Sequence, residues 1–244
     1  MMTNQELIQR IRACRLADLS DGMDAIGLVN TGTMSSQMRP LRPGIRMAGF
    51  AYTVKLIPTQ KAAKVCSTYE EYQKGLGAWC QETYAFLGGL MDGRGKDKVV
   101  VIDMDGYPGG VWGSECGMNA AKNGVVGVVI DGGCRDSYEC NLEHLDIWCT
   151  ARTFNHVYGR LESGGVNVPV ECAGVVVHPG DVVCGDDDGV LVIPRERAEQ
   201  VVAFAEGILK ADQKVRALHY KDLGYEYDET LGEFGAETDP AAAR

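Results

Sequence analysis

The chain has 244 residues, 45% of them hydrophobic, so it can bury a full core as one domain or as two small ones. Its formal net charge of −10 argues against a nucleic-acid-binding protein, which needs a basic surface to displace counterions from phosphate. No apolar run approaches the roughly 18 residues of a membrane span, and the first residues lack the features of a signal peptide. We therefore expect a soluble cytoplasmic protein that binds neither nucleic acid nor membrane.

Two helices and a strand are predicted first along the chain. Apolar residues recur at helical spacing over residues 3–26, with a break near Arg15. Residues 47–56 alternate well enough to form a strand. Residues 58–95 interleave aromatic with polar residues and are longer than most crossover connections. We expect helix and loop in this aromatic-rich insertion, which is placed to wall a pocket.

A central βαβ unit follows the insertion. Residues 98–103 and 125–130 are apolar and rich in β-branched side chains, which is typical of parallel strands buried on both faces. A glycine-rich loop over residues 103–110 and a helix over residues 111–124, ended by Gly124, connect them. This order predicts an α/β fold.

The second of these strands runs into Gly132-Gly133-Cys134-Arg135-Asp136, the most informative stretch of the chain. The glycines predict a turn, and ligands of open α/β sheets bind outside the carboxyl ends of such strands. Arg135 offers a fork for a carboxylate and Asp136 an oxygen ligand for a metal ion. Backbone N–H groups at the start of the preceding helix are expected to complete an anion site, at Gly113, Ser114, Glu115 and Cys116. A solvated Arg–Asp pair is the alternative.

The last third of the chain is predicted to be rich in strands. Strand-like runs occupy residues 168–178, 180–186 and 189–194. The acidic triplet from Asp186 to Asp188 lacks the spacing of an EF-hand loop, so a turn is favoured over a calcium site. A helix is expected to close the fold near residues 195–220. Residues 1–222 then form a single domain, and the acidic segment 223–244 a flexible or surface-draped tail.

A carboxylate-binding Arg135 next to a metal-binding Asp136 suits the chemistry of 2-oxo acids. One protein carboxylate, several waters and a chelating ligand form a typical arrangement around Mg²⁺ or Mn²⁺. The metal polarises the carbonyl and stabilises an enolate at the neighbouring carbon. Retro-aldol cleavage or decarboxylation that leaves pyruvate enolate follows, with Arg135 and Asp136 as catalytic residues. Glu139, one helical turn later, is either a further metal ligand or a plain solvent-facing residue.

Other chemistries find less support. The nine cysteines form no Cys-x-x-Cys pair, and Cys134 has no histidine nearby in sequence to activate its thiol. Lys55 and Lys122 raise the possibility of a Schiff base, but nothing near Lys55 in sequence suggests a lowered pKa. His144 and His156 have no partner motif and are interpreted as structural.

The same residues resemble a known family. The resemblance to the RraA-like family, which includes class II 4-hydroxy-4-methyl-2-oxoglutarate/4-carboxy-4-hydroxy-2-oxoadipate aldolases and the RraA regulators of ribonuclease E, covers about residues 16–205. It rests on Trp112-Gly113, on Ala120-Ala121-Lys122, and on residues 127–136, 177–181 and 186–190. The resemblance implies a layered α/β/β/α domain and a homotrimer, or a homohexamer made of two trimers, with sites between subunits.

By match of motif, Arg135 binds the pyruvoyl carboxylate and Asp136 ligates Mg²⁺ or Mn²⁺ partly through water. The regulator branch lacks the acidic residue after the arginine, so Asp136 favours the enzyme branch. Many aldolases of the family carry an acid directly after the Trp-Gly pair, where this chain has Ser114 and then Glu115.

The resemblance also implies an acidic residue from the last helix of a neighbouring subunit, for which Glu206 and Asp212 are candidates. Together these features predict a divalent-metal-dependent lyase that acts on a 4-hydroxy-2-oxo acid and decarboxylates oxaloacetate as a side activity. Two alternatives stay open. One is a non-catalytic regulator that binds a ribonuclease, and the other is a related metal-enolate lyase or hydratase with a sugar-acid substrate.

Overall fold

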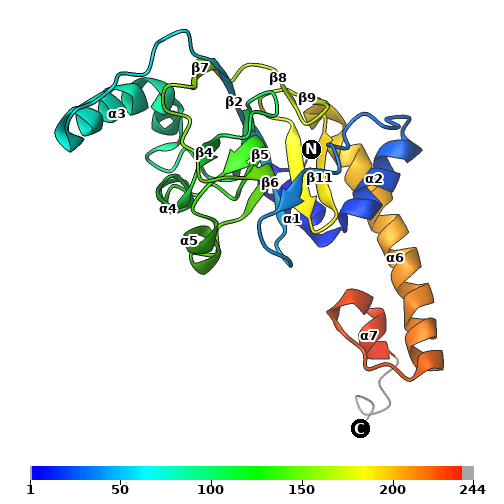
Figure 1. The fold of residues 1–244 in the computed structure, drawn as a ribbon. Helices are drawn as coiled ribbons and strands as arrows, with labels where there is room; N and C mark the ends of the chain where they lie inside the picture. The colour runs from blue at the N-terminus through cyan, green and yellow to red at the C-terminus, as the bar shows by residue number, and fades with distance from the viewer. Residues whose placement is uncertain (1, 238–244) are drawn as a thin grey trace.

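The computed structural model describes residues 2–237 and contains one large sheet with helices on two sides (Figure 1). The strands are β1 Arg39–Pro40, β2 Met47–Pro58, β3 Lys98–Asp103, β4 Gly110–Trp112, β5 Gly127–Cys134, β6 Ile147–Arg152, β7 Leu161–Val166, β8 Val170–Cys172, β9 Val175–Val177, β10 Val182–Asp186 and β11 Gly189–Ile193. The α-helices are α1 Asn4–Ala13, α2 Leu16–Ala25, α3 Tyr69–Thr83, α4 Ser114–Lys122, α5 Ser137–Leu142, α6 Ala198–Leu223 and α7 Phe234–Glu237. Short 3₁₀ helices occupy Ala85–Leu90, Arg195–Arg197 and Glu229–Leu231.

The large sheet has the strand order β1-β6-β5-β3-β2-β10-β11, with β4 paired to β5 and β7 paired to β2. Its centre is parallel: β2 pairs with β3, β3 with β5 and β5 with β6. β7, β10 and β11 add antiparallel pairs at and beyond β2. The unit β3–α4–β5 is the predicted βαβ unit, and both of its strands are buried, as their apolar sequences predicted.

Buried side chains form three clusters that define the layers. On one face of the sheet, Val100 and Ile102 of β3 pack with residues of α3, α4 and α5. On the other face, Val99 and Val101 pack toward the small β8–β9 sheet. The third cluster joins α1, α2 and α6 to β10 and β11. Figure 1 shows α2 and α6 on the opposite side of the molecule from α3, α4 and α5. This arrangement confirms the predicted α/β class.

Two predictions around the centre of the fold were wrong in detail. β5 continues through Cys134, so Gly132 and Gly133 lie in the strand instead of forming a turn after it. The reason is close packing: a Cβ on Gly133 would lie 2.7 Å from the carbonyl oxygen of Gly109. The stretch that was expected to open the helix forms β4, which pairs in parallel with β5, and the helix begins only at Ser114.

The two ends of the chain follow the sequence more closely. α1 and α2 are separated at Cys14 and Arg15, as predicted, and a capping box between Thr3 and Glu6 begins α1. Residues 186–189 form the predicted hairpin turn between β10 and β11. The part of the tail up to residue 237 folds back on α6, where Leu231 is fully buried. The remaining tail residues, 238–244, lie outside the described residues. None of the helices that residues 2–237 form has the length and apolar character to cross a membrane.

Candidate active site

A cavity of about 280 Å³ lies where the C-terminal end of β5 meets β4 and the start of α4. The cavity is lined by Arg135 and by four of the other five site residues that the sequence predicted. Residues of the aromatic-rich insertion complete it. Its lining residues are Cys80, Tyr84, Leu87, Val111, Gly113, Glu115, Cys116, Asn119, Arg135, Asp136 and His156. Ser114 is the predicted residue that is missing from this lining. Its hydroxyl donates a hydrogen bond to Glu143 Oε1 at 2.7 Å, which ties the start of α4 to the end of α5.

Arg135 and Asp136 are held in place by the backbone around them. The Arg135 N–H donates to the carbonyl of Trp112 at 2.8 Å, which fastens the end of β5 to β4. Asp136 begins α5 in the left-handed conformation, with φ of 55°, a region that Asp and Asn adopt more readily than most residues. Arg135 Nε lies 3.3 Å from Asp136 Oδ1, and about a third of each side chain is exposed. Both groups can therefore meet a ligand from solvent.

Gly113 gives the Asp136 carboxylate its space. A Cβ at position 113 would lie 2.3 Å from Asp136 Oδ2 and 3.2 Å from Arg135 Cγ. Gly113 is also the N-cap of α4, which starts without a side-chain cap, so no side chain occupies the amides of its first turn. The positive end of this helix consequently lies beside the Asp136 carboxylate, where it favours negative charge.

The insertion and the loop after β6 supply an aromatic wall. Tyr84 donates its hydroxyl hydrogen to the carbonyl of Val111 at 2.7 Å, and burial raises its pKa well above the usual value. The ring of Trp79 lies 5.5 Å from that of His156, edge to face, and the Tyr84 ring lies 6.4 Å from it. The insertion was predicted to wall a pocket, and residues of α3 and of the 3₁₀ helix that follows it do line this cavity.

His156 has a defined hydrogen-bonding state. Its Nδ1 accepts a hydrogen bond from the backbone N–H of Tyr158 at 2.8 Å. Burial, with the positive charge of Arg135 nearby, lowers the pKa of His156 to about 4. The ring is thus neutral near pH 7, with its hydrogen on Nε2. The sequence assigned His156 a structural role because no motif surrounds it, whereas the fold places it on the wall of the Arg135 cavity.

The cysteines of this region are poor nucleophiles. Burial raises the pKa of Cys116 to about 12 and also raises that of Cys80. The hydrogen bond with the Cys140 thiol, together with burial, raises the pKa of Cys134 far above its usual value. A thiolate is therefore scarce at all three positions near pH 7, so none of these cysteines is poised to act as a nucleophile.

Several other candidates lie away from the cavity. Lys55 Nζ is 2.6 Å from Asp103 Oδ2, a carboxylate that is almost fully buried, so its ammonium group is paired. Glu206 binds Arg10 at 2.6 Å and Asp212 binds Arg15 at 2.7 Å, both on the α6 side of the molecule. Three further candidates are absent from the lining of the cavity: Lys122, Glu139 and His144.

The donor set of the cavity suits a hydrated cation. Among residues 2–237, no group of three or more His, Cys, Asp or Glu side chains is arranged to hold a metal ion. The cavity instead presents two carboxylates, Asp136 and Glu115, in an open setting. Mg²⁺ and Mn²⁺ prefer oxygen ligands, and Mg²⁺ keeps several waters while it binds one or two carboxylates and the substrate. The residues present therefore fit such an ion.

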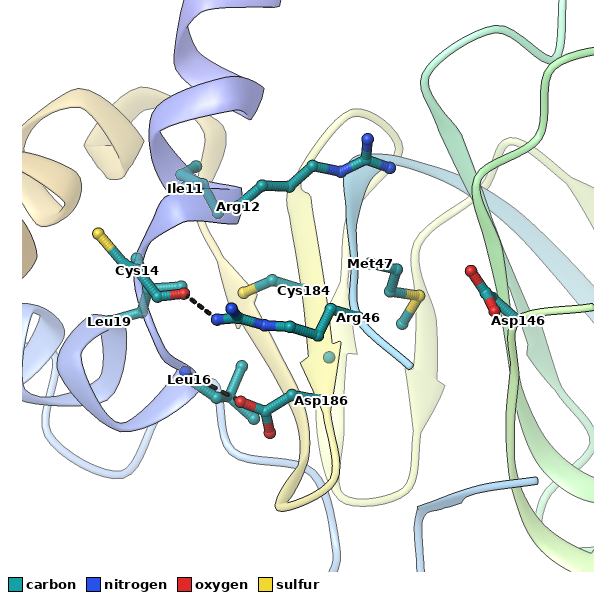
Figure 2. Close-up of a pocket in the computed structure, with 11 residues that line it drawn as sticks. Ile11, Arg12, Cys14, Leu16, Leu19, Arg46, Met47, Asp146, Cys184 and Asp186 are labelled. Atoms are coloured by element: carbon teal, nitrogen blue, oxygen red, sulfur yellow. Dashed lines mark hydrogen bonds between the residues drawn. The ribbon is translucent and has the colours of Figure 1, made fainter. Parts of the chain in front are cut away.

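A second cavity, of about 410 Å³, lies between α1, α2 and β10 (Figure 2). Two of its charged side chains have backbone partners. Arg46 donates to the carbonyl of Cys14 at 2.6 Å, and Asp186 accepts from the Leu16 N–H at 3.2 Å. Arg135 and Asp136 are not among its lining residues, so the chemistry predicted from the sequence belongs to the smaller cavity.

Comparisons with known proteins show the family of the chain. A family model described as Aldolase/RraA, for RraA-like proteins, matches residues 16–192, which include the whole of the β3–α4–β5 unit and Arg135-Asp136. A protein of Halalkalibacterium halodurans with the name "putative 4-hydroxy-4-methyl-2-oxoglutarate aldolase" is 28% identical over 212 residues, which are 86% of this chain and 87% of that protein.

Two further likenesses concern proteins with other names. Protein DlpA of Legionella pneumophila is 28% identical over 215 residues, but these are 88% of this chain and only 32% of DlpA, so the chain spans about a third of that relative. RraAS2 of Streptomyces coelicolor, described as an unusual member of the RNase ES inhibitor RraA protein family, superposes with a TM-score of 0.71 at 23% identity. That likeness covers 88% of this chain and 98% of RraAS2, and it shows the shared fold.

Proposed function

Since the chain belongs to the RraA-like family, we propose that it is a divalent-metal-dependent lyase that cleaves a 4-hydroxy-2-oxo acid and leaves pyruvate. The observation that carries the proposal is the pair Arg135–Asp136 at an open cavity, with a guanidinium and a carboxylate 3.3 Å apart. Such a pair suits a ligand whose carboxylate binds the Arg135 guanidinium while its other oxygens bind a metal ion held by Asp136. Relatives that are named as aldolases support the choice of a lyase.

Each group at the cavity has a part in this proposal. Arg135 binds the substrate carboxylate with its guanidinium fork and orients the 2-oxo group. Asp136 would hold Mg²⁺ or Mn²⁺. An ion bound there would supply Lewis-acid chemistry, which draws electrons from the 2-oxo group. Glu115 is the second carboxylate of the lining and is the proposed proton acceptor.

The proposed reaction breaks the bond between C3 and C4. Its electron pair stays with the pyruvate fragment as an enolate, while the 4-hydroxyl group loses its proton to Glu115 and becomes a carbonyl. C3 of the enolate then takes up a proton to give pyruvate. Decarboxylation of oxaloacetate leaves the same enolate, and we propose it as a side activity.

We further propose a homotrimer or homohexamer in which a neighbouring subunit approaches the cavity. Glu206 and Asp212 lie on α6, and Figure 1 places α6 on the opposite side of the chain from α4 and α5. An acid of α6 can therefore take part only at the site of another subunit. It would first have to leave its ion pair with Arg10 or Arg15.

The test is pyruvate release from 4-hydroxy-4-methyl-2-oxoglutarate and from oxaloacetate, by metal-stripped protein to which Mg²⁺ or Mn²⁺ is returned. Asp136→Asn is the sharpest variant, because Asn tolerates the left-handed backbone at φ 55° while it removes the charge. We expect a loss of at least about 100-fold in activity, as for a group that binds the metal. Asp92→Asn is the matched control, because Asp92 also has a left-handed backbone and lies on the exposed surface.

The possible outcomes distinguish the three candidate functions. Pyruvate release that needs metal and depends on Asp136 supports the lyase. Metal-independent release, or equal rates in the Asp136→Asn and wild-type proteins, contradicts it. No release from any 4-hydroxy-2-oxo acid favours the regulator, and turnover of sugar acids alone favours the related lyase or hydratase.

A further inference from the structure

The indole N–H of Trp112 differs from those of the two other tryptophans. Trp79 donates to the carbonyl of Leu161 at 3.2 Å, and Trp148 donates to the carbonyl of Asp186 at 2.9 Å. Trp112 is fully buried, yet its Nε1 has no hydrogen-bond partner among the residues that the structure describes. Buried N–H groups of native proteins nearly always bond to protein or to ordered water. This group therefore points to a partner that is not part of the chain.

Glu143 has a second polar atom of this kind. Its Oε1 accepts the hydrogen bond from the Ser114 hydroxyl at 2.7 Å. Its Oε2 is buried and has no hydrogen-bond donor within residues 2–237. A buried carboxylate oxygen without a donor is more unfavourable than a neutral group in the same state. A donor for Glu143 and an acceptor for Trp112 are thus both required.

One cavity connects the two residues. It has a volume of about 140 Å³ and lies between α4 and the segment that joins α5 to β6, and Trp112 and Glu143 both line it. Gly117 lines it too, and a Cβ there would lie 3.4 Å from Trp112 Nε1, so the N–H edge of the ring lies at the cavity. A water molecule takes up about 30 Å³, and cavities of sufficient size with polar groups hold water. This cavity has both the room and the polar groups.

We infer that this cavity binds an ordered water molecule that accepts the Trp112 N–H and donates a hydrogen bond to Glu143 Oε2. Water suits the pair, because a single molecule has both hydrogens to donate and lone pairs to accept. A bridging water is nearly as favourable in enthalpy as a direct hydrogen bond. Neither atom has another partner among residues 2–237, and the two do not bond to each other. The inference goes beyond the proposed function and does not depend on it.

The water gives Glu143 a role at the candidate active site. Trp112 and Ser114 are the neighbours of Gly113 in the chain. Both are then tied to Glu143, the first through the water and the second directly. Gly113 in turn lies so close to the Asp136 carboxylate that it has no room for a Cβ. Glu143 is therefore a positioning residue, which fixes the backbone beside Asp136 from the far end of α5.

A crystal structure at a resolution that shows ordered water tests the site directly. We expect a density peak about 2.7–3.2 Å from both Trp112 Nε1 and Glu143 Oε2. The N–H of Trp148, which is equally buried, is the control and should keep its bond to the Asp186 carbonyl without a water. A direct bond between Trp112 and Glu143, an occupant other than water, or a cavity without density would overturn the inference.

Two variants of Glu143 test the tie. Glu143→Gln keeps an oxygen for Ser114 and gains an NH₂ group that donates to the water, whose lone pairs then accept from both sides. Glu143→Ala removes both contacts. We expect Tm to stay within about 2 °C of the wild type in Glu143→Gln and to fall by at least about 4 °C in Glu143→Ala. Equal values of Tm in the two variants would contradict the tie.

A double-mutant cycle tests the bridge itself. Trp112→Phe removes the N–H, and its loss in Tm should be smaller by at least about 2 °C in the Glu143→Ala background, where the water has already lost one partner. Trp148→Phe is the matched control, with the same loss expected in both backgrounds. If the loss for Trp112→Phe is also the same in both, no water couples the two residues.

The positioning role has readouts of its own. Crystal structures of the two variants should show Gly113 displaced from Asp136 by more than about 0.5 Å in Glu143→Ala and superposed on the wild type in Glu143→Gln. Where the protein releases pyruvate, kcat should fall by at least about 3-fold in Glu143→Ala with little change in KM, and Glu143→Gln should restore it. An unmoved Gly113, or a wild-type kcat in Glu143→Ala, would refute positioning by Glu143 and leave the lyase proposal intact.

Discussion

The backbone N–H of Tyr158 donates a hydrogen bond to Nδ1 of His156 at 2.8 Å. A neutral imidazole whose Nδ1 is an acceptor has its hydrogen on Nε2. This contact makes His156 a neutral donor at the cavity of Arg135, and it opposes protonation of the ring.

The state of His156 predicts a pH dependence of stability. Its pKa in the folded protein is about 4, below the ordinary value of 6.5, so between these values the unfolded chain binds more protons than the folded one. The free energy of unfolding therefore falls as the pH is lowered through this window. We expect His156 to account for about 1 kcal/mol between pH 7 and pH 5, with allowance for solvent screening. Urea unfolding at both pH values measures it.

His156→Gln should show a smaller loss of stability between pH 7 and pH 5 than the wild type. His219→Gln is the control, because this histidine is exposed on α6. If the wild-type and His156→Gln proteins lose the same free energy of unfolding on acidification, the ring is not held neutral by the fold.

The Arg135 side chain should govern substrate affinity. Arg135→Lys keeps the charge but loses the planar fork that binds a carboxylate with two hydrogen bonds. We expect KM for 4-hydroxy-2-oxo acids to rise by about 10-fold to 100-fold in Arg135→Lys, and further in Arg135→Gln. Steady-state kinetics measures this change, with the exposed Arg94→Lys as the control. An unchanged KM would remove Arg135 from the binding site.

Gly113 should be required for the position of the Asp136 carboxylate. The backbone of Gly113 is extended, so alanine suits its conformation, but the added Cβ would lie 2.3 Å from Asp136 Oδ2. We expect Gly113→Ala to lower metal-dependent pyruvate release by at least about 10-fold, while the free energy of unfolding changes by about 1 kcal/mol or less. Gly207→Ala on α6 meets no atom within 4 Å and serves as the control. Full activity in Gly113→Ala would show that the carboxylate can move without loss.

Lys55 should stabilise the fold without taking part in the reaction. Its Nζ lies 2.6 Å from Asp103 Oδ2, and the Asp103 side chain is only 2% exposed. Lys55→Met leaves this buried carboxylate without its cation, which we expect to cost about 2–4 kcal/mol of unfolding free energy. Asp103→Asn in the same chain should restore part of the loss, and chemical unfolding measures both.

The same variant tests Schiff-base chemistry. Borohydride added in the presence of pyruvate would trap a covalent adduct on a reactive lysine. We expect no adduct in the wild-type protein, by mass spectrometry, and retained pyruvate release by Lys55→Met at a temperature where it is folded. An adduct at Lys55 would replace the metal-dependent scheme.

Local patterns in the sequence were enough to predict most elements. The apolar runs that form β3 and β5, the helical spacing on either side of Arg15, and the turn at residues 186–189 each depend on neighbours in the chain. The position of Arg135 and Asp136 at the end of β5 followed for the same reason. The exact end of β5 did not, because it depends on the pairing of Gly133 with both β4 and β6, strands that lie elsewhere in the chain.

The sequence by itself thus determined the α/β class, the family resemblance and the pair Arg135–Asp136, all of which depend on residues that are adjacent or regularly spaced. Only the tertiary structure decided what surrounds this pair. Tyr84 comes from the insertion and His156 from the loop after β6, and the packing of both segments beside β4 brings them to the same cavity. Ser114 turned instead toward Glu143. Contacts between such distant segments depend on strand order and side-chain packing, which no local pattern of residues encodes.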